Sequence, residues 1–302
     1  MKKGRLLSPE AKPLEGKVLA AQIQEQIKKE IEAFALKGFK PPGLLVLQAD
    51  SNPSSTWYVG QQEKLSAKLG IRFEKIGPEK ITTQADLITQ LESRSHSFHG
   101  IFLAQPFPKS FNADEILLRL DLKKDVEGVH PASLGLIVLR KTRLIPPTAY
   151  AALQLIEHAV KESGKNLKGM KAAIVGQSAI VGRPLNLLLG EKRVTTIVCN
   201  TGTSAADLQK FVSESDIVVA CAGQPGLVKG SWIKPGAIVI DVGTTEVNGK
   251  LMGDVEFEEA KKHASYITPV PGGVGPLTVT MLMQNLLHAY QWQHNLAGHP
   301  PA

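Results

Sequence analysis

The sequence has little of what marks several large classes of protein. It contains only two cysteines, Cys199 and Cys221, among 302 residues, which is too few for a disulfide framework. Each cysteine ends an apolar run, so we expect buried, reduced thiols. Aromatic residues make up 5% of the chain and the basic residues are scattered, so neither the stacking platform nor the basic stripe of a nucleic-acid-binding protein is present.

Long hydrophobic runs are also missing. No segment reaches the roughly 20 apolar residues of a transmembrane helix, and residues 1–16 contain no apolar stretch of signal-peptide length. We therefore expect a cytoplasmic protein without a membrane partner. The net charge of +7 indicates either a general solubility charge or attraction of anionic ligands such as nucleotide phosphates or glutamate tails.

The composition and patterning predict a folded α/β protein. Hydrophobic residues are 43% and charged residues 21% of the chain, and the length suits two modest domains or one large one. Residues 1–13 are polar and are expected to be loose. In the first half, apolar periodicity and turn residues predict helix 14–36, strand 43–47, a turn at 51–55, helix 57–69, strand 71–76, helix 85–91 and strand 100–104.

The second half repeats this alternation more clearly. It predicts helix 150–163 and strands 171–175, 195–199, 216–221, 237–241 and 265–267, with helices between the first three of these strands. Alternating strands and helices are typical of parallel βαβ units. A final helix over 277–292 has no strand after it. It either packs on the second domain or, as we prefer, returns to the first.

A glycine-containing segment between a predicted strand and a predicted helix is a candidate phosphate loop. In the segment Gly176–Pro184, backbone N–H groups and the helix dipole could hold a pyrophosphate. Its spacing is not G-x-G-x-x-G, because Ser178 replaces the middle glycine, and an ordinary tight connection is the alternative. Arg183 suits either a phosphate contact or a structural ion pair. The segment 198–203, after the next strand, has neither acidic nor basic residues, so it leaves NAD and NADP open.

Five stretches, in one order along nearly the whole chain, carry a resemblance to a known family. They are Ser51–Ser55 with Tyr58-Val59, Lys124–Gly128, Gly176–Pro184, Val239–Gly243 and Tyr266–Pro276. The last is long and highly specific. Together they resemble the methylenetetrahydrofolate dehydrogenase/methenyltetrahydrofolate cyclohydrolase family, whose bacterial members are usually bifunctional.

The resemblance implies an architecture, a substrate and a cofactor. It implies an N-terminal α/β folate-binding catalytic domain (1–147 and 277–302, with the returning C-terminal helix), a Rossmann-type NAD(P)-binding domain (148–276) and a cleft between them. The resemblance also implies a tetrahydrofolate-type substrate and NADP or NAD as cofactor. It further implies a homodimer formed through the nucleotide-binding domains. The implied cofactor-binding residues are Gly176, Gln177, Ser178, Arg183, Thr201 and, through its backbone, Thr244.

The segment Pro269–Pro276 has a physical interpretation of its own. Prolines fix φ, and glycines let the backbone approach a ligand closely. We therefore expect Pro271, Gly272 and Gly273 to contact a flat pterin. A rigid turn before the last helix is the alternative, because glycine and proline dominate turns in general.

The positions where the family performs its chemistry depart from the family pattern. The family places a tyrosine, which stacks on the folate, one helical turn before a lysine that serves the proton chemistry. Tyr58 is kept, but the lysine position is Gln62. Lys64 lies roughly 200° further around a helix of 3.6 residues per turn, so it should not substitute.

Two further positions differ. The family has a glutamine at the end of a strand where this chain has Ala104, and the neighbouring Gln105 should point to the opposite face unless a bulge intervenes. The second aspartate of a Lys-Asp-Val-Asp-Gly motif, which binds the pterin edge, is Glu127 here. Its carboxylate is kept on a longer arm. The resemblance thus gives Tyr58, Gln62 and Glu127 as catalytic positions, and Tyr58, Ala104 and Glu127 as substrate-binding ones.

The two family reactions make different demands on these residues. Hydride transfer relies on the cofactor, with the protein orienting two rings, whereas hydrolysis of the methenyl group needs a titratable side chain. Gln62 is not titratable. We therefore predict NAD(P)-dependent oxidation of 5,10-methylenetetrahydrofolate to 5,10-methenyltetrahydrofolate with weak or absent cyclohydrolase activity. The alternatives are a fully bifunctional enzyme, a non-catalytic paralogue that binds folate or nucleotide, and an enzyme with a changed substrate.

Two other features of the sequence say less about function. His96 and His99 could pair on a helical turn, but no third ligand of suitable spacing lies near, so no metal site is expected. Asp241, at the end of a predicted strand, is interpreted as a structural carboxylate.

Overall fold

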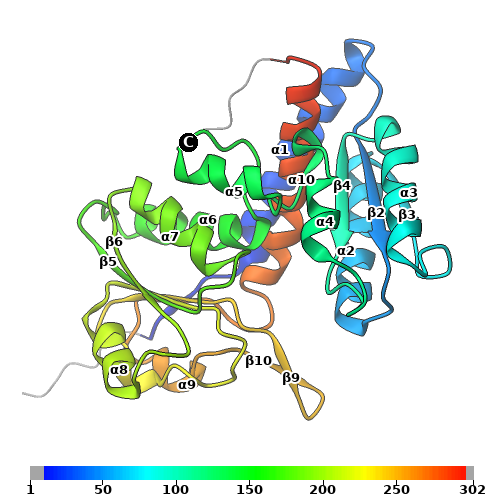
Figure 1. Ribbon diagram of the computed structural model, residues 1–302. Coiled ribbons are helices and arrows are strands. Elements are labelled where there is room, and N and C mark those ends of the chain that lie inside the picture. Colours follow the sequence, from blue (N-terminus) through cyan, green and yellow to red (C-terminus); the bar gives the residue numbers. More distant parts are fainter. Residues whose placement is uncertain (1–9, 297–302) are drawn as a thin grey trace, which may run out of the picture. The chain divides into compact units, whose positions relative to one another are not determined.

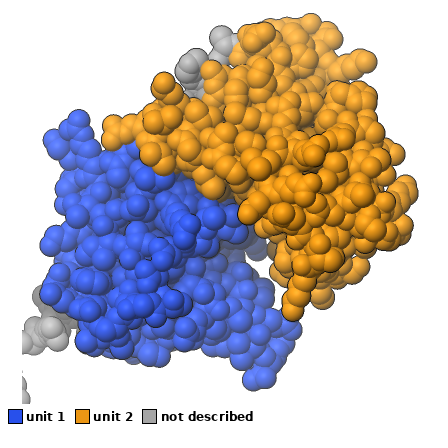
Figure 2. All heavy atoms as spheres, in the orientation of Figure 1, with its two compact units in different colours: residues 1–19, 148–277 blue, residues 20–147, 278–302 orange. Residues whose placement is uncertain are grey.

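The structure is a computed structural model that describes residues 10–296 and divides into two compact units (Figure 1, Figure 2). Of the described residues, unit 1 contains 10–19 and 148–277, and unit 2 contains 20–147 and 278–296. The predicted domains were 1–147 with 277–302, which corresponds to unit 2, and 148–276, which corresponds to unit 1. The prediction therefore placed residues 10–19 with unit 2, whereas the structure places them in unit 1. Both units have the α/β architecture that the alternation of strands and helices predicts.

Unit 1 is built on a six-stranded parallel sheet. The strand order is β1-β11-β8-β7-β5-β6. The strands are β1 (Lys12–Pro13), β5 (Lys171–Val175), β6 (Thr195–Cys199), β7 (Ile217–Ala220), β8 (Ile238–Asp241) and β11 (Tyr266–Ile267). The helices of this part of the chain are α6 (Pro147–Glu162), α7 (Gly182–Glu191), α8 (Ala205–Glu214) and α9 (Phe257–Ala260), with a short 3-10 turn at Gly230–Trp232. The predicted strands from 171 to 267 are confirmed. The parallel sheet buries nearly all residues of β5, β7 and β8, whereas β6, at the edge of the sheet, is only partly buried.

Two parts of unit 1 differ from expectation. The expectation that residues 1–13 are loose is wrong for the described residues of this segment. The backbone N–H groups of Ala11 and Lys12 donate to Lys261 and Ser265 (2.8 and 2.9 Å), so β1 joins the sheet beside β11. The second difference is an unpredicted antiparallel hairpin of β9 (Thr245–Val247) and β10 (Lys250–Met252).

Unit 2 is built on a three-stranded parallel sheet, β3-β2-β4, with helices on both faces. One face packs against α1 (Gly16–Leu36, from Ala20 onward), α2 and α10 (Val274–Gln293, from Thr278 onward). The other face packs against α3 and α4. The elements are β2 (Gly43–Gln48), α2 (Pro53–Leu69), β3 (Arg72–Ile76), α3 (Gln84–Arg94), β4 (Gly100–Ala104), α4 (Ala113–Leu118) and α5 (Pro131–Val138), with 3-10 turns at Ser95–Ser97 and Leu122–Lys124.

Helix α2 begins earlier than predicted. Asn52 Oδ1 accepts hydrogen bonds from the backbone N–H groups of Ser54 (3.0 Å) and Ser55 (3.3 Å), and Pro53 occupies the first turn, where its missing N–H is harmless. The predicted turn at 51–55 was therefore wrong for residues 53–55, which are helical. Gly70, at φ 73°, ends the helix. This capping fixes the start of the helix that carries Tyr58.

The last helix, α10, is part of the core of unit 2. Leu282 and Leu286 are fully buried there, and Asn285 Nδ2 donates to the carbonyl oxygens of Val126 (2.8 Å) and Ile145 (2.7 Å). Figure 1 shows α10 running beside α1, and Gln24 Nε2 joins the two helices by donating to Thr280 Oγ1 (2.9 Å). The segment around Val126 is thus held in place by the C-terminal helix.

Two partly buried histidines predict how unit 2 responds to acid. Burial lowers the pKa of His99 and of His288 to about 4, and nearby positive charges add to the effect at His99. An unfolded histidine binds a proton below about pH 6.5. The stability that these neutral side chains confer is therefore present above pH 6.5 and is lost as the pH falls from 6.5 to 4.

The expected result is a steeper loss of stability on acidification in the wild type than in a His288→Leu variant. The measurement is the free energy of unfolding from denaturant titrations between pH 7.5 and 4.5. Buried carboxyl groups such as Glu127, whose pKa is raised by burial, act in the opposite sense in both proteins. The difference between wild type and variant therefore isolates His288, and parallel curves would contradict the assignment.

Candidate active site and nucleotide loop

The topology of unit 1 defines where a ligand should bind. Strand β5 lies between β6 and β7, so the chain leaves β5 to one side and later returns to the other. In open parallel sheets this switch point, at the carboxyl ends of the strands, opens the crevice that holds ligands. The loop Gly176–Val181 follows β5 at this point and leads into α7.

The loop is shaped by two close backbone contacts that only glycine permits. Gly176 has φ +121°, and a Cβ on it would lie 2.4 Å from the carbonyl oxygen of Cys221. A Cβ on Gly182 would lie 2.0 Å from the carbonyl oxygen of Gly176. The backbone N–H of Arg183 donates to Ser178 O (3.1 Å). The loop therefore folds tightly on itself and on the strand beside it.

The helix after the loop presents an uncapped N-terminus. No side chain caps α7 at Val181, and its first turn has no acidic residue. The predicted cofactor residues Gln177, Ser178 and Arg183 are exposed around it. Free N–H groups and the positive end of the helix dipole suit an anion. These residues fit the pyrophosphate of a dinucleotide.

The other predicted cofactor residues lie in loops at the same edge of the sheet. Thr201 follows β6 and Thr244 follows β8, and both side chains are exposed. Thr245 Oγ1 donates to Gly223 O (3.4 Å) and links the loops after β8 and β7. The structure thus brings the predicted cofactor residues to one edge of one sheet.

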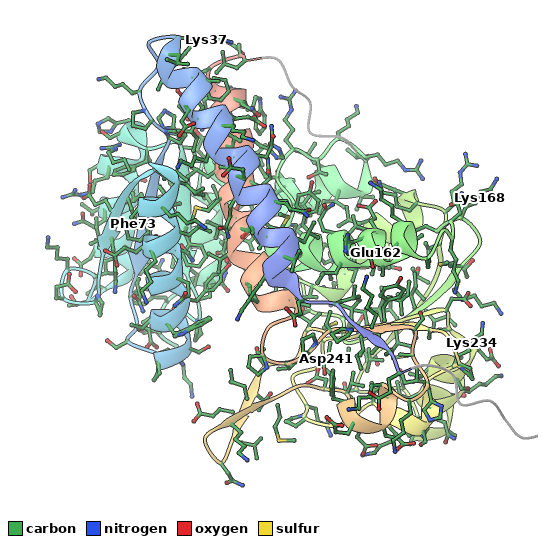
Figure 3. All side chains as sticks on the ribbon, turned by 180° about the vertical axis from the view of Figure 1, so that it is seen from behind. Lys37, Phe73, Glu162, Lys168, Lys234 and Asp241 are labelled. Atoms are coloured by element: carbon green, nitrogen blue, oxygen red, sulfur yellow. The ribbon has the colours of Figure 1, made fainter. Side chains whose placement is uncertain are left out.

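Two buried carboxylates hold these loops together. Asp241 accepts hydrogen bonds from the backbone N–H groups of Gly243, Asp254 and Val255, at 2.9–3.0 Å (Figure 3 labels Asp241). Asp254 Oδ2 accepts from Ala222 N (2.7 Å) and Gly223 N (2.9 Å). Burial raises the pKa of Asp241 to about 6, while the backbone donors oppose that rise. These contacts agree with the structural role expected for Asp241.

A cavity of about 470 Å³ in unit 1 lies away from the phosphate loop. Lys165, Lys168 and Lys234 line it, and Lys234 Nζ pairs with Asp216 Oδ1 at 2.5 Å (Figure 3 labels Lys168 and Lys234). The cavity lies before the start of β5, β7 and β8, at the amino ends of the strands. Ligands of doubly wound sheets bind at the carboxyl ends, so this cavity is not the nucleotide site.

In unit 2, Tyr58 lies on α2 over the carboxyl half of β4. Its ring centroid is 5.7 Å from that of Phe102, and the side chain is half-buried. Burial raises the pKa of Tyr58 well above its usual range, and the nearby charge of Glu127 raises it further. The phenol therefore stays neutral at physiological pH. It can stack on a flat ligand or donate a hydrogen bond.

Gln62 lies one turn after Tyr58 and is completely buried. Neither its Nε2 nor its Oε1 has a hydrogen-bond partner among the described residues. A buried polar group without a partner costs about 1–3 kcal/mol. Lys64, two residues further along α2, is exposed, whereas Gln62 is buried.

The strand end at Ala104 is regular. Ala104 pairs with Gln48 in the unbroken parallel register of β2 and β4, and its side chain is buried on the face that Tyr58 covers. Gln105 is exposed. The regular register shows no bulge that would turn Gln105 toward the buried face.

Glu127 adds a carboxyl group to the same region. Its Oε2 is buried and has no partner within residues 10–296, and burial, followed by the charge of Asp125, raises its pKa well above the usual value. Asp125 is already engaged, since it accepts hydrogen bonds from Val129 N (3.2 Å), His130 N (2.9 Å) and Ser133 Oγ (2.5 Å). Of the two acids, Glu127 is the one with a free oxygen.

The sequence interpretation missed Gln48, which ends the otherwise apolar strand β2. The residue is 1% exposed, its Nε2 donates to Thr56 Oγ1 (2.9 Å), and its Oε1 is unpartnered among residues 10–296. A polar residue closing the apolar run Gly43–Leu47 was the available signal. Its importance depended on the strand register, which the sequence does not show.

The predicted pterin-contacting loop belongs to unit 1. Pro271, Gly272 and Gly273 lie between β11 and α10, and Gly272 O accepts a hydrogen bond from Gly16 N (3.1 Å). Gly273 is buried, and a Cβ on Gly16 would lie 1.9 Å from its carbonyl oxygen. The loop is thus anchored on the first turn of α1, whereas Tyr58 and its neighbours form a separate group in unit 2.

No group of three or more His, Cys, Asp or Glu side chains within residues 10–296 could hold a metal ion. In the same part of the chain, no helix combines the length and the apolar character needed to cross a membrane.

The two halves of the chain match two family models. Residues 14–127 match the catalytic domain of tetrahydrofolate dehydrogenase/cyclohydrolase, and residues 146–294 match its NAD(P)-binding domain. The chain is therefore similar in sequence to both parts of one family.

Individual relatives agree over nearly the full length. The chain is 41% identical to "Bifunctional protein FolD 1" of Hydrogenovibrio crunogenus (92% of this chain, 97% of the relative) and 40% identical to "Bifunctional protein FolD" of Aquifex aeolicus (92% and 94%). In structure it is similar to the Trypanosoma brucei methylenetetrahydrofolate dehydrogenase-cyclohydrolase, solved with NADP and an inhibitor. That match has a TM-score of 0.88 at 34% identity and covers 96% of this chain and 100% of the other. The chain belongs to the tetrahydrofolate dehydrogenase/cyclohydrolase family, with a catalytic α/β domain and an NAD(P)-binding domain of Rossmann type.

Proposed function

We propose that this member of a one-carbon folate family oxidises 5,10-methylenetetrahydrofolate with NADP or NAD and has little or no methenyltetrahydrofolate cyclohydrolase activity. The expected lack of cyclohydrolase activity rests on Gln62, which is buried one turn from Tyr58 and has no titratable group. The proposal includes a homodimer, as the family resemblance implies.

The phosphate loop of unit 1 supports cofactor binding. Gly176 and Gly182 keep the loop close to the sheet, and the uncapped start of α7 offers N–H groups to the pyrophosphate. The bound nicotinamide would accept the hydride. The task of the protein in this reaction is to orient two rings, and nothing in that task needs a lysine at position 62.

The side chains around Tyr58 support folate binding. The neutral phenol and ring of Tyr58 offer a stacking surface, and Glu127 has a free carboxyl oxygen for an N–H group of the pterin. The raised pKa of Glu127 favours a protonated carboxyl, which can both donate and accept a hydrogen bond. This pair can hold a reduced folate in place for hydride transfer.

Hydrolysis of the methenyl group places a further demand on the site. Water must be delivered and a proton moved by a side chain with a suitable pKa, which typically contributes 10²–10⁴-fold to the rate. The amide of Gln62 neither gains nor loses a proton near neutral pH. The dehydrogenase step can therefore persist while the hydrolytic step is lost.

The wild-type enzyme tests the proposal in paired assays on one preparation. We expect reduction of NADP or NAD with 5,10-methylenetetrahydrofolate, and hydrolysis of methenyltetrahydrofolate no faster than in buffer. Rapid hydrolysis would contradict the proposed loss. Absence of both reactions, with folate and nucleotide still bound in calorimetry, would instead indicate a non-catalytic paralogue.

A further inference from the structure

The group of side chains around Tyr58 contains one glutamine that the proposed reaction does not yet use. Gln48 and Ala104 are directly paired at the carboxyl ends of β2 and β4. Directly paired residues of parallel strands point to the same face of the sheet, and neighbouring strands lie about 4.8 Å apart. The side chain of Gln48 therefore starts one strand away from Ala104, on the same face.

That face is the one covered by Tyr58. Leu44 and Val46, which precede Gln48 at two-residue intervals, pack in one cluster with Phe102, Ala104 and Tyr58. The Nε2 of Gln48 donates to Thr56 Oγ1, in the turn of α2 just before Tyr58. The amide is thus tied to the start of the helix that presents the tyrosine.

The other end of this amide is free. Gln48 is 1% exposed and its Oε1 has no partner among the described residues, although buried carbonyl groups in proteins are almost always hydrogen-bonded. With Nε2 donating to Thr56, Oε1 is the atom left without a partner, and a carbonyl oxygen can only accept. An N–H donor on a ligand next to Tyr58 would satisfy it.

We propose that Gln48 is a substrate-binding residue that supplies from β2 the amide that Ala104 lacks on β4, with its Oε1 accepting a hydrogen bond from an N–H group of the reduced folate. This inference rests on the proposed function, since it assigns the folate ring to the surroundings of Tyr58. It makes Gln48 a determinant of substrate affinity in this chain.

The test exploits the difference between a binding residue and a structural one. Gln48→Leu removes the amide but keeps the approximate size of the side chain. It should raise the KM for 5,10-methylenetetrahydrofolate about 10-fold, which is the scale of one buried hydrogen bond. The KM for the nucleotide should stay within two-fold. The thermal midpoint of the unliganded protein should stay equal or rise, because an unpartnered carbonyl has been replaced by an apolar group.

Two further variants make the test specific. Gln105→Leu applies the same chemical change to the exposed neighbour of Ala104 and should leave all three quantities unchanged. In the double variant Gln48→Leu/Ala104→Gln, the amide moves to the paired position, and the KM for the folate should return to within about three-fold of wild type, because a rescue need regain only most of that one hydrogen bond.

An unchanged folate KM in Gln48→Leu would overturn the inference, and so would a fall in thermal midpoint without a change in KM, which indicates a structural role. If the wild type binds tetrahydrofolate in calorimetry but does not oxidise its methylene derivative, the proposed function fails on its own. The dissociation constants of tetrahydrofolate for wild type and Gln48→Leu then decide the inference by the same 10-fold criterion. A wild type that does not bind tetrahydrofolate would overturn both.

Discussion

Replacing Gly176 by alanine is expected to weaken binding of NADP and NAD at least 100-fold and to destabilise unit 1 by about 3–5 kcal/mol. The new Cβ would lie 2.4 Å from the backbone oxygen of Cys221, and the residue sits at φ +121°, where side chains are strained. Backbone atoms cannot rotate away as a side-chain tip can. The loop must therefore open, and its N–H groups no longer converge on the pyrophosphate.

Gly190→Ala is the matched control. Gly190 lies in α7, the helix that follows the same loop, and a Cβ there meets nothing within 4 Å. Alanine favours helix over glycine by up to about 1 kcal/mol, so this variant should bind nucleotide normally and unfold at the same or a higher temperature. Calorimetric titration with each nucleotide and thermal unfolding measure both effects. Normal nucleotide affinity in Gly176→Ala would show that the loop is not the binding element.

Replacing Gln62 by lysine is expected to raise the rate of methenyltetrahydrofolate hydrolysis at least 100-fold above wild type, the lower end of what a positioned acid–base group contributes. The position is completely buried and one turn from Tyr58, so an amine there would be desolvated. Desolvation lowers the pKa of a lysine and brings its proton exchange nearer to neutral pH.

Gln62→Met controls for this change, because methionine fills the position with an unbranched chain that cannot exchange a proton. The decisive measurement is loss of methenyltetrahydrofolate in wild type and both variants at equal enzyme concentration, beside the dehydrogenase rate. Faster hydrolysis of methenyltetrahydrofolate in the lysine variant alone supports the proposal. Equal rates in all three proteins would contradict the idea that position 62 by itself limits hydrolysis and would direct attention to Ala104 and Glu127.

The fold was predictable where burial is continuous in the sequence. Strand β5 is apolar after its first residue and β8 is apolar up to its last, and helices such as α2 end at a glycine. The hairpin of β9 and β10 was missed although Asn248-Gly249, both at positive φ, is a strong turn signal, because its strands are short and largely exposed. Strand β1 was missed because β11, with which it pairs, lies some 250 residues away in the chain.

The candidate site was predictable only in part for a related reason. The positions of Tyr58 and Gln62 follow from helical spacing, which is local. The contribution of Gln48 depends on which residue of β4 stands beside it, and register between strands is a long-range property. The free oxygen of Glu127 similarly depends on Asp125 being engaged by three other donors.

The return of α10 to unit 2 has a consequence for how the protein is made. Leu282 and Leu286, with their neighbours in α10, complete a core whose remaining members lie between Ile23 and Val126, and residues 148–277 must be synthesised in between. At roughly 5–20 residues per second, a ribosome needs about 7–25 seconds for that interval. Part of the apolar face of β2 and β4 lacks its covering helix during this time, and exposed apolar surface of this kind makes a nascent chain prone to aggregation.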